Sequence, residues 1–227
     1  MSEQYLVFDY ETRSKADLDL TGAYEYAVHP STRIMCVAWR LGTFETLKTA
    51  PTRWWSPALP SPYGEFKKAL FDPNTKLVAH NVFFENVITH HVLKKLIHDL
   101  PEIPISRWIC TAAMARSSGL PGKLDFVSQA LDLSHKKDME GHRLMLKMSK
   151  PRKPTKDNPS IWHNKKSDLE RLIAYCVADI DAEVELFLRL FNVAEVSTNT
   201  QERKYWEMDQ AKNLNGIYTD QELVNAA

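Results

Sequence analysis

The sequence lacks the features that mark several large protein classes. Its three cysteines, Cys36, Cys110 and Cys176, are odd in number, widely separated and never arranged as C-x-x-C. That pattern argues against a disulfide framework or a zinc site and favours free, mostly buried thiols in a reducing compartment. No apolar run approaches the length of a membrane span, and the N-terminal residues MSEQ include no basic region leading into an apolar segment. We therefore expect a cytoplasmic protein.

The sequence also lacks a net charge, because Lys+Arg and Asp+Glu both total 29. The distribution is uneven, however: residues 136–166 contain ten basic residues against three acidic ones, a net charge of +7. The ten are Lys136, Lys137, Arg143, Lys147, Lys150, Arg152, Lys153, Lys156, Lys165 and Lys166. A run of this kind is usually a solvated, flexible surface, and that interpretation is favoured for the run alone. The alternative is a positively charged surface that guides a polyanion to a neighbouring acidic site.

Composition and pattern predict one substantial domain plus an appendage, or two small domains. With 227 residues, of which 44% are hydrophobic and 26% charged, the chain has the make-up of an ordinary soluble globular protein. Strands are predicted at 4–10, 34–40, 43–48 and 76–80, and a proline-rich stretch at 50–62 predicts an extended surface loop. Helices are predicted at 64–71, 83–97, 124–131, 139–148 and from the capping box S-x-x-E at 167–170 to about Phe191. This order predicts a mixed sheet flanked by helices.

The stretch "YLVFDYET", residues 5–12, contains two acids that need a partner. Four apolar residues run into Asp9-Tyr10-Glu11, which is typical of a buried strand with both carboxylates on one face. Like charges this close repel, and burying them is costly unless a cation compensates.

Two further stretches carry acids in suggestive positions. "LVAHNVFFENV", residues 77–87, places Glu85 in the first turn of a helix, where the helix dipole favours a carboxylate. "YCVAD", residues 175–179, places Tyr175 and Asp179 on one face of a helix. Each has an ordinary explanation when taken alone: a solvated strand end, a helix-start acid, or a helix acid paired with a lysine. The following Asp181, Glu183 and Glu185 are interpreted as ordinary surface acids.

Taken together, Asp9-x-Glu11, Asn81-x-x-Phe84-Glu85 and Tyr175-x-x-x-Asp179 resemble the three motifs of the DEDD 3′–5′ exonucleases, a DnaQ-like family with an RNase H-like fold. Tyrosine four residues before the aspartate is the DEDDy form, because the position used by the histidine form is Ala174. The resemblance covers roughly residues 4–191. The segments "TAAMARSSGLPGKLDFVSQALDL" and "KKDMEGHRLMLKMSKPRKPT" resemble the exonuclease domain of phage-type family A DNA polymerases.

The resemblance implies an α/β protein with an RNase H-like mixed central sheet, flanking helices and a C-terminal helical tail. It implies that Asp9, Glu11, Glu85 and Asp179 hold two Mg²⁺ or Mn²⁺ ions, since hard oxygen ligands without histidine or cysteine suit these cations. Such a pair clamps the attacking and leaving oxygens of a phosphodiester, and Tyr175 would orient the water. Glu85 departs from the aspartate usual in the second motif, which puts the second metal site in question.

The implied substrate is the 3′ end of single-stranded or frayed DNA, with release of nucleoside 5′-monophosphates. Asn81 and Phe84 would hold the terminal nucleotides, with the main chain around Tyr10, and Thr12, near the terminal sugar. The basic segment, represented by Lys136, Lys137 and Arg143, would follow the upstream phosphates. Two alternatives stay open: an RNA-trimming DEDDy exonuclease of the ribonuclease D kind, and a module of the same fold that binds DNA ends or a replication partner without cleaving.

The tail beyond residue 192 has a different character. A helix is predicted from about Gln201 to Asn213, ended by Asn215-Gly216, and Thr219 or Asp220 would cap a further helix. This segment resembles the entry into the polymerase portion of family A enzymes. We therefore expect an exonuclease domain at 1–192 and a tail at 193–227 that leads to a polymerase domain or docks a separate polymerase chain. In the separate case Trp206 and its apolar neighbours would form an exposed patch, and otherwise the tail packs back on a monomeric exonuclease.

Overall fold

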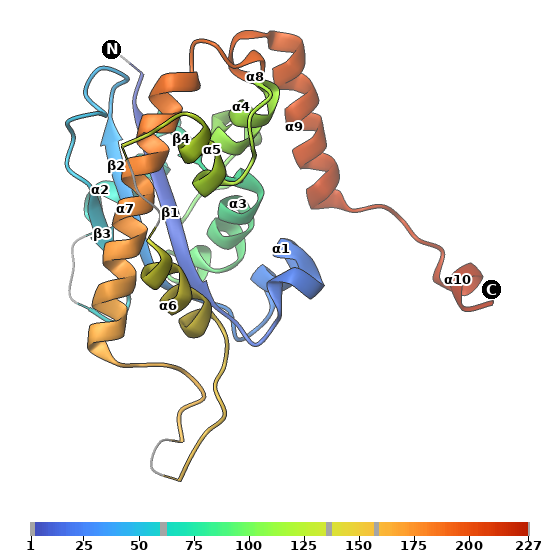
Figure 1. Ribbon diagram of the computed structural model, residues 1–227. Coiled ribbons are helices and arrows are strands. Elements are labelled where there is room, and N and C mark those ends of the chain that lie inside the picture. Colours follow the sequence, from blue (N-terminus) through green and yellow to red (C-terminus); the bar gives the residue numbers. More distant parts are fainter. Residues whose placement is uncertain (1–2, 60–62, 135–137, 157–158, 227) are drawn as a thin grey trace.

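The computed structural model describes residues 3–59, 63–134, 138–156 and 159–226, built around a five-stranded sheet of order β3-β2-β1-β4-β5 (Figure 1). The strands are β1 (Tyr5–Arg13), β2 (Arg33–Gly42), β3 (Arg53–Trp55), β4 (Lys76–Ala79) and β5 (Trp108–Cys110). The central strand β1 pairs antiparallel with β2 and parallel with β4. The sheet is therefore mixed, as the sequence predicts.

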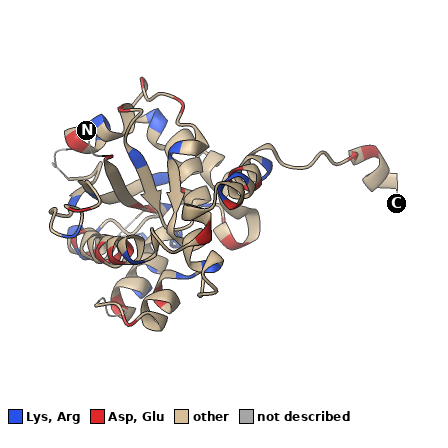
Figure 2. Ribbon diagram, turned by 90° about the horizontal axis from the view of Figure 1, so that it is seen from above, with Lys and Arg blue, Asp and Glu red and all other residues tan. Residues whose placement is uncertain are grey.

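Helices cover both faces of this sheet (Figure 1). They are α1 (Leu18–Val28), α2 (Gly64–Phe71), α3 (Val82–His91), α4 (Thr111–Ser117), α5 (Leu124–Ala130), α6 (Met139–Ser149), α7 (Lys166–Leu190), α8 (Glu195–Thr198), α9 (Thr200–Asn215) and α10 (Gln221–Ala226), with short 3₁₀ turns η1 (Leu93–Lys95) and η2 (Ile105–Arg107). Among the described helices, none is long and apolar enough to cross a bilayer. Basic and acidic residues are interspersed over the helices (Figure 2), so clusters of one sign are local features.

Alternation along β1 divides the core into two clusters. Leu6, Phe8 and Tyr10 face the cluster that contains the apolar residues of α2 and α3, whereas Tyr5 and Val7 face the cluster under α7. The same alternation continues into the acidic end of the strand. The strand period therefore directs both acids of "DYE" toward α7, as the two-residue spacing predicts. The three cysteines are buried and free, as expected.

The predicted strand at 43–48 is wrong. These residues form turns closed by the bond from Leu47 N to Thr43 O, 2.9 Å long, and the Thr46 hydroxyl accepts from Thr43 N at 2.8 Å. Threonine hydroxyls that bond the local backbone compete with strand pairing. The third strand of the meander is β3 instead, which lies inside the stretch predicted as a loop and pairs with residues 37–39 of β2.

Besides β3, the elements α1, β5, α4, α8 and the 3₁₀ turn η2 were not predicted from the sequence. Helix α1 carries a non-helical residue, Gly22 (φ 76°), which interrupts its periodicity, and β5 is only three residues long. The helix predicted from 167 is confirmed, but not its cap. Helix α7 begins at Lys166 after an N-cap at Lys165 that makes no side-chain bond, so Ser167 does not cap it.

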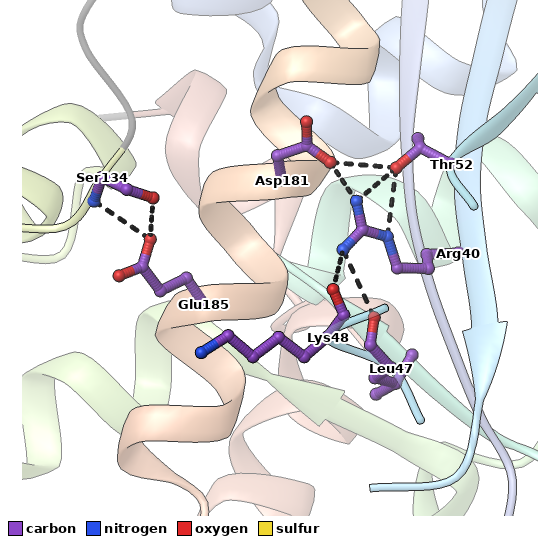
Figure 3. A network of polar contacts seen from close by, with 7 residues as sticks. All are labelled: Arg40, Leu47, Lys48, Thr52, Ser134, Asp181 and Glu185. Carbon is purple, nitrogen blue, oxygen red and sulfur yellow. Dashed lines mark hydrogen bonds and ion pairs between the residues drawn. The ribbon is translucent and has the colours of Figure 1, made fainter. Parts of the chain in front are cut away.

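Two acids on the flanks of α7 fasten neighbouring segments to it (Figure 3). Asp181 accepts from Arg40 of β2 and, at 2.9 Å, from the Thr52 hydroxyl, and Arg40 also donates to the carbonyls of the turn after β2. Glu185 accepts from both the backbone and the hydroxyl of Ser134, at 3.0 and 2.6 Å. These two residues behave as ordinary pairing acids, as the sequence predicts.

The C-terminal segment is partly docked on the sheet edge. Arg203 of α9 stacks over Trp206, 4.5 Å from the ring centroid, and donates to the carbonyl of Trp108 at 2.6 Å. Trp206 is only half-exposed and packs against both core clusters, so it does not form the exposed patch expected of it. Its neighbours Tyr205 and Met208 are exposed, and α10 lies apart from the body of the molecule (Figure 1).

Candidate active site

A cavity of about 540 Å³ lies at the C-terminal end of β1, between α1, the start of α3, the end of α6 and the middle of α7. All five residues expected to carry the chemistry line it: Asp9, Glu11, Glu85, Tyr175 and Asp179. They come from three segments separated by more than 70 residues along the chain. The fold therefore brings the three motifs to one place.

The two acids of β1 lie beside a thiol of α7. Cys176 Sγ is 3.5 Å from the backbone oxygen of Asp9 and 3.6 Å from its Oδ2. The ligand atoms of Asp9, Glu11 and Cys176 lie within 4.8 Å of one another, a group that could hold a metal ion. A hydrogen bond with Cys36 and burial raise the pKa of Cys176 well above its usual value, so the sulfur stays a neutral thiol that donates to Asp9. Hard cations bind oxygen in preference to such a sulfur.

Glu85 projects from the first turn of α3 into a closed environment. The chain enters this helix through Asn81 in the left-handed conformation (φ 67°), which aims the first turn at β1. The Glu85 side chain is 2% exposed, and its Oε2 has no hydrogen-bond partner among the described residues. A buried carboxylate oxygen without a partner is costly unless a cation or water occupies the space in front of it. The longer glutamate side chain thus still delivers a free oxygen to the cavity.

Tyr175 and Asp179 occupy successive turns of α7 and interact. A hydrogen bond with the Tyr175 hydroxyl lowers the pKa of Asp179, although burial and the charge of Asp9 together raise it to about 8. Burial and the same carboxylates raise the pKa of Tyr175, so its hydroxyl stays protonated at neutral pH. A side-chain methyl at Gly141 of α6 would overlap the Tyr175 ring, so the missing Cβ allows α6 to hold this ring in place.

Burial raises the pKa values of all four carboxylates, and the charge of Asp9 raises those of the other three further. Burial raises the pKa of Asp9 to about 7, against a lowering by the Cys176 hydrogen bond. Burial and then the charge of Asp9 put the pKa values of Glu11 and Glu85 well above the usual range. Among the described residues, no ion pair involves any of these acids. Divalent cations would lower the free-energy cost of ionising these four carboxylates. Carboxylate oxygens, including the Glu85 Oε2 that has no hydrogen-bond partner among the described residues, are the ligands that such ions prefer.

Glu183, interpreted from the sequence as a surface acid, is 1% exposed and lies one turn beyond Asp179 on the same face of α7. Burial and the charge of Asp9 raise its pKa well above the usual range. Its Oε1 lies 3.2 Å from the Thr111 hydroxyl, which is 2.9 Å from Nδ1 of His80. The four-residue spacing Tyr175, Asp179, Glu183 is the signal that could have found it.

The residues expected to hold the terminal nucleotides divide into two kinds. Asn81 is exposed and Phe84 half-exposed at the cavity, and Phe84 lies against Tyr26 with ring centroids 6.0 Å apart. The side chains of Tyr10 and Thr12 are buried: Tyr10 bonds Thr89 at 3.1 Å and Thr12 bonds the Tyr26 hydroxyl at 2.9 Å. The main chain of Tyr10 remains the part expected to meet a sugar.

The basic residues expected upstream are not those that line the cavity. Lys136 and Lys137 lie outside the described residues, and Arg143 is exposed on α6 and is not among the lining residues. Lys150, at the end of the same helix, lines the cavity instead and pairs with Asp17, the N-cap of α1, at 3.1 Å. The sequence shows the excess of charge but not which lysine faces the site.

No family model matches the chain. The chain is 32% identical over 227 residues to the DNA polymerase of Bacillus phage SP02, a match that covers 98% of this chain and 33% of that protein. It therefore spans about a third of the length of this relative. The likeness agrees with the resemblance drawn from the three motifs.

One solved structure supports the fold. NrnC of Brucella melitensis superposes with a TM-score of 0.50 at 16% identity, over 96% of this chain and 89% of that one. This likeness and the observed elements give the expected RNase H-like architecture, with a mixed sheet, helices on both faces and further helices at the C-terminus. Escherichia coli RNase D, described as an exoribonuclease involved in structured RNA processing, gives a TM-score of 0.49 at 14% identity, over 91% of this chain and 44% of that one.

Proposed function

We propose that this chain, a relative of a phage DNA polymerase, is a metal-dependent DEDDy 3′–5′ exonuclease that removes nucleotides from DNA 3′ ends as the proofreading part of a phage-type family A polymerase. One observation carries the proposal: four carboxylates converge on one cavity, and among the described residues none of them is paired with a cationic side chain, because Lys150 in the lining pairs with Asp17 instead. The Tyr175 hydroxyl lies beside them and stays protonated. Structural acids are normally paired, so this excess of negative charge is typical of a site built to hold cations.

Asp9, Glu11, Glu85 and Asp179 would hold two Mg²⁺ or Mn²⁺ ions. When bound, these ions would supply Lewis acidity to the attacking water and to the departing 3′ oxygen. Glu85 contributes the orphaned Oε2, and Cys176 orients Asp9 by donating to its carboxylate. The carboxylate oxygens would therefore fix the positions of the metal ions before the substrate binds. Phosphoryl transfer depends on such preorganised charge.

Tyr175 would orient the attacking water. Its hydroxyl stays protonated, interacts with Asp179 and lies at the cavity, so it can donate to or accept from a water beside the scissile phosphate. Asn81 and Phe84, which line the same cavity, would hold the terminal nucleotides. Attack on phosphorus breaks the bond to the 3′ oxygen of the preceding nucleotide, and the products are a nucleoside 5′-monophosphate and a strand one residue shorter.

The choice of DNA as the substrate rests on the likeness to a phage DNA polymerase. The following experiment tests this choice against the RNA-trimming alternative. Single-stranded DNA and RNA of the same sequence, labelled at the 5′ end, are incubated with Mg²⁺ or Mn²⁺, with and without chelator, beside the Asp9→Ala variant. We expect stepwise shortening of DNA from the 3′ end, faster than of RNA, and no shortening with chelator or with the variant. Faster RNA shortening would favour the ribonuclease function. Retarded migration of DNA without shortening would favour the non-cleaving module.

For the polymerase association, we propose that residues 193–227 connect or dock the exonuclease domain, residues 1–192, to a polymerase. The exposed Ile217, Tyr218, Leu223 and Val224 support this, since they add apolar surface to a segment that lies apart from the core. Limited proteolysis is the test. A cut after α9 that leaves nuclease activity intact is expected, whereas unfolding on loss of residues 216–226 would contradict it.

A further inference from the structure

A second cavity, of about 760 Å³, lies beyond the end of β1 and is distinct from the acid-lined one. Three cationic side chains from separate segments line it: Arg13 at the end of β1, Arg33 at the start of β2 and Lys95 after α3. His163, before α7, lies in the same lining. Among the described residues no Asp or Glu lines it, and the rest of its wall is mainly apolar, including Ile34, Met35 and Leu96. A cavity of this size with an apolar floor and a few convergent charges is typical of a ligand site.

The cations of this cavity have no acidic partners among the described residues. Arg13 stacks over Trp162, 5.0 Å from the ring centroid, and donates to Asn164 at 2.9 Å, while its Nε is buried without a hydrogen-bond partner. Arg33 donates only to the carbonyls of Pro30 and Thr32. Burial and the neighbouring Arg33 charge lower the pKa of Arg13. Two guanidinium groups that repel each other beside an unsatisfied donor would be stabilised by an anion.

The cavity shares its walls with the candidate active site. In β1, Thr12 lines the active-site cavity and the next residue, Arg13, lines the second cavity. In α6, Ser149 lines the active-site cavity and the preceding residue, Met148, lines the second cavity. Ser14 joins the segments that form the wall between the two cavities. Its backbone nitrogen donates to the Ser149 carbonyl at 3.0 Å, and its hydroxyl accepts from the Thr32 hydroxyl at 2.8 Å. The two cavities therefore adjoin across this wall, so an extended strand held in one could continue into the other.

We propose that this second cavity binds an upstream nucleotide of the strand whose 3′ end lies in the active site, with the phosphate on Arg13 and Arg33 and the base against the apolar floor. The inference rests on the proposed nuclease function and deepens it. Arginine forks match phosphate geometry, and an apolar surface accepts the face of any base, so the contact would be independent of sequence. It would anchor long strands and leave very short ones unaided.

The test compares KM values for two DNA substrates with the same 3′ sequence, a dinucleotide and a strand of about twelve nucleotides. The variants are Arg33→Gln, a surface change, and Arg13→Gln. Arg189→Gln is the matched control, because Arg189 is exposed near the other end of α7. We expect both cavity variants to raise KM for the long strand roughly three- to tenfold with little change in kcat. The control should match the wild type on both substrates.

Binding of the long strand is also measured with chelator present, by fluorescence polarisation over a range of salt concentrations. Arg33→Gln should make the slope of log Kobs against log salt shallower by about 0.7, the loss of one phosphate contact. An unchanged slope and unchanged KM for the long strand would overturn the second site. An equal rise in KM for both substrates would do so as well, because it would place the arginines at the 3′ end.

These outcomes separate the inference from the proposed function. A wild-type protein that hydrolyses both substrates with equal KM retains the nuclease function and loses the second site. If the wild-type protein hydrolyses neither the dinucleotide nor the long strand, the proposed nuclease function is wrong. Salt-dependent binding of the long strand that weakens in Arg33→Gln but not in Arg189→Gln would then still locate a nucleic-acid contact in the cavity. Inhibition by free deoxynucleoside monophosphate that disappears in Arg33→Gln without a change in long-strand KM would mean a free-nucleotide site instead.

Discussion

Helix α7 carries acids on two faces, and the two sets of acids have different roles. Asp179 and Glu183 face the sheet, where they lie among other carboxylates with raised pKa values. Asp181 and Glu185, each two residues further along, pair with Arg40 and Ser134 and fasten α7 to its neighbours (Figure 3). The helix period alone separates the two sets, because residues two apart point about 200° away from each other.

The contrast teaches how to recognise a functional acid without a bound ion. An acid near the surface that pairs with a cation or a hydroxyl is explained by structure. An acid that is buried among like charges without a cation beside it is not explained by the folded chain alone, even where a hydroxyl donates to it, so it calls for a ligand. The variants and conditions below exploit this difference, starting where the two faces should differ most.

The largest effect is expected from Asp179→Asn. Removing one carboxylate from the inward face should lower the exonuclease rate by roughly a thousandfold or more, because charge that stabilises the transition state is lost. The melting temperature without metal should stay the same or rise, since repulsion is relieved. Rates on a labelled oligonucleotide and thermal denaturation test both parts. A variant with normal metal-dependent activity would remove Asp179 from the site.

Tyr175→Phe should have the next largest effect. The change keeps the ring that packs beside Gly141 and removes only the hydroxyl that would orient water. The single-turnover rate should fall about 10²–10⁴-fold, the usual range for a positioned proton-handling group. Affinity for DNA, measured with chelator, should stay close to wild type. An unchanged rate across neutral pH would mean that Tyr175 is only a packing residue.

Stability without metal should depend on pH in the direction set by the inward acids. The folded-state pKa values of Asp9 and Asp179, about 7 and about 8, lie above the value near 4 of an unfolded aspartate. The folded protein therefore binds more protons than the unfolded one between these values, and the free energy of unfolding should decline as pH rises from about 4 and level off above about 8. Added Mg²⁺ should restore stability mainly at the upper end.

Thermal denaturation from about pH 5 to about pH 9, with chelator or with Mg²⁺, measures this effect. We expect the metal-free melting temperature to fall by several degrees across the range and the Mg²⁺-dependent increase to be largest near pH 8. The variant Asp179→Asn should flatten the metal-free curve. A metal-free melting temperature that rises with pH over this range would show that the inward acids are compensated by groups of the protein itself.

The sequence predicted which acids meet at the cavity, because the three motifs carry particular residue types at fixed spacings. Asp9, Glu11, Glu85 and Asp179 could therefore be chosen from their resemblance to those motifs, and all four line the cavity. Glu183 was missed because acids at every second position of an amphipathic helix look alike, and only its four-residue spacing from Asp179 indicates that it shares the inward face. For the same reason the charge excess at 136–166 did not reveal that Lys150, rather than Arg143, lines the cavity.

The elements missed were those whose local signals are weak. Helix α1 is interrupted at Gly22, and β5 consists of three residues that gain their strand conformation from pairing with β4. Conversely, the apolar residues at 43–48 look like a strand in isolation, but local threonine hydrogen bonds close a turn there. Tertiary pairing decides short elements, and a single sequence does not contain that information.

Asp181→Asn should have the smallest effect, and it is the matched control for Asp179→Asn. Both changes replace one carboxylate of α7 by an amide, two residues apart. Asp181 is half-exposed, and its partner Arg40 keeps bonds to the Thr52 hydroxyl and to the carbonyls of Leu47 and Lys48. Exposed ion pairs contribute about 0.2–1 kcal/mol, so the free energy of unfolding should fall by about that amount and exonuclease activity should stay at the wild-type level. Chemical denaturation and the oligonucleotide assay measure the two quantities. A loss of activity as large as that of Asp179→Asn would mean that the cavity depends on the attachment of α7 to β2, and the separation of the two faces would fail.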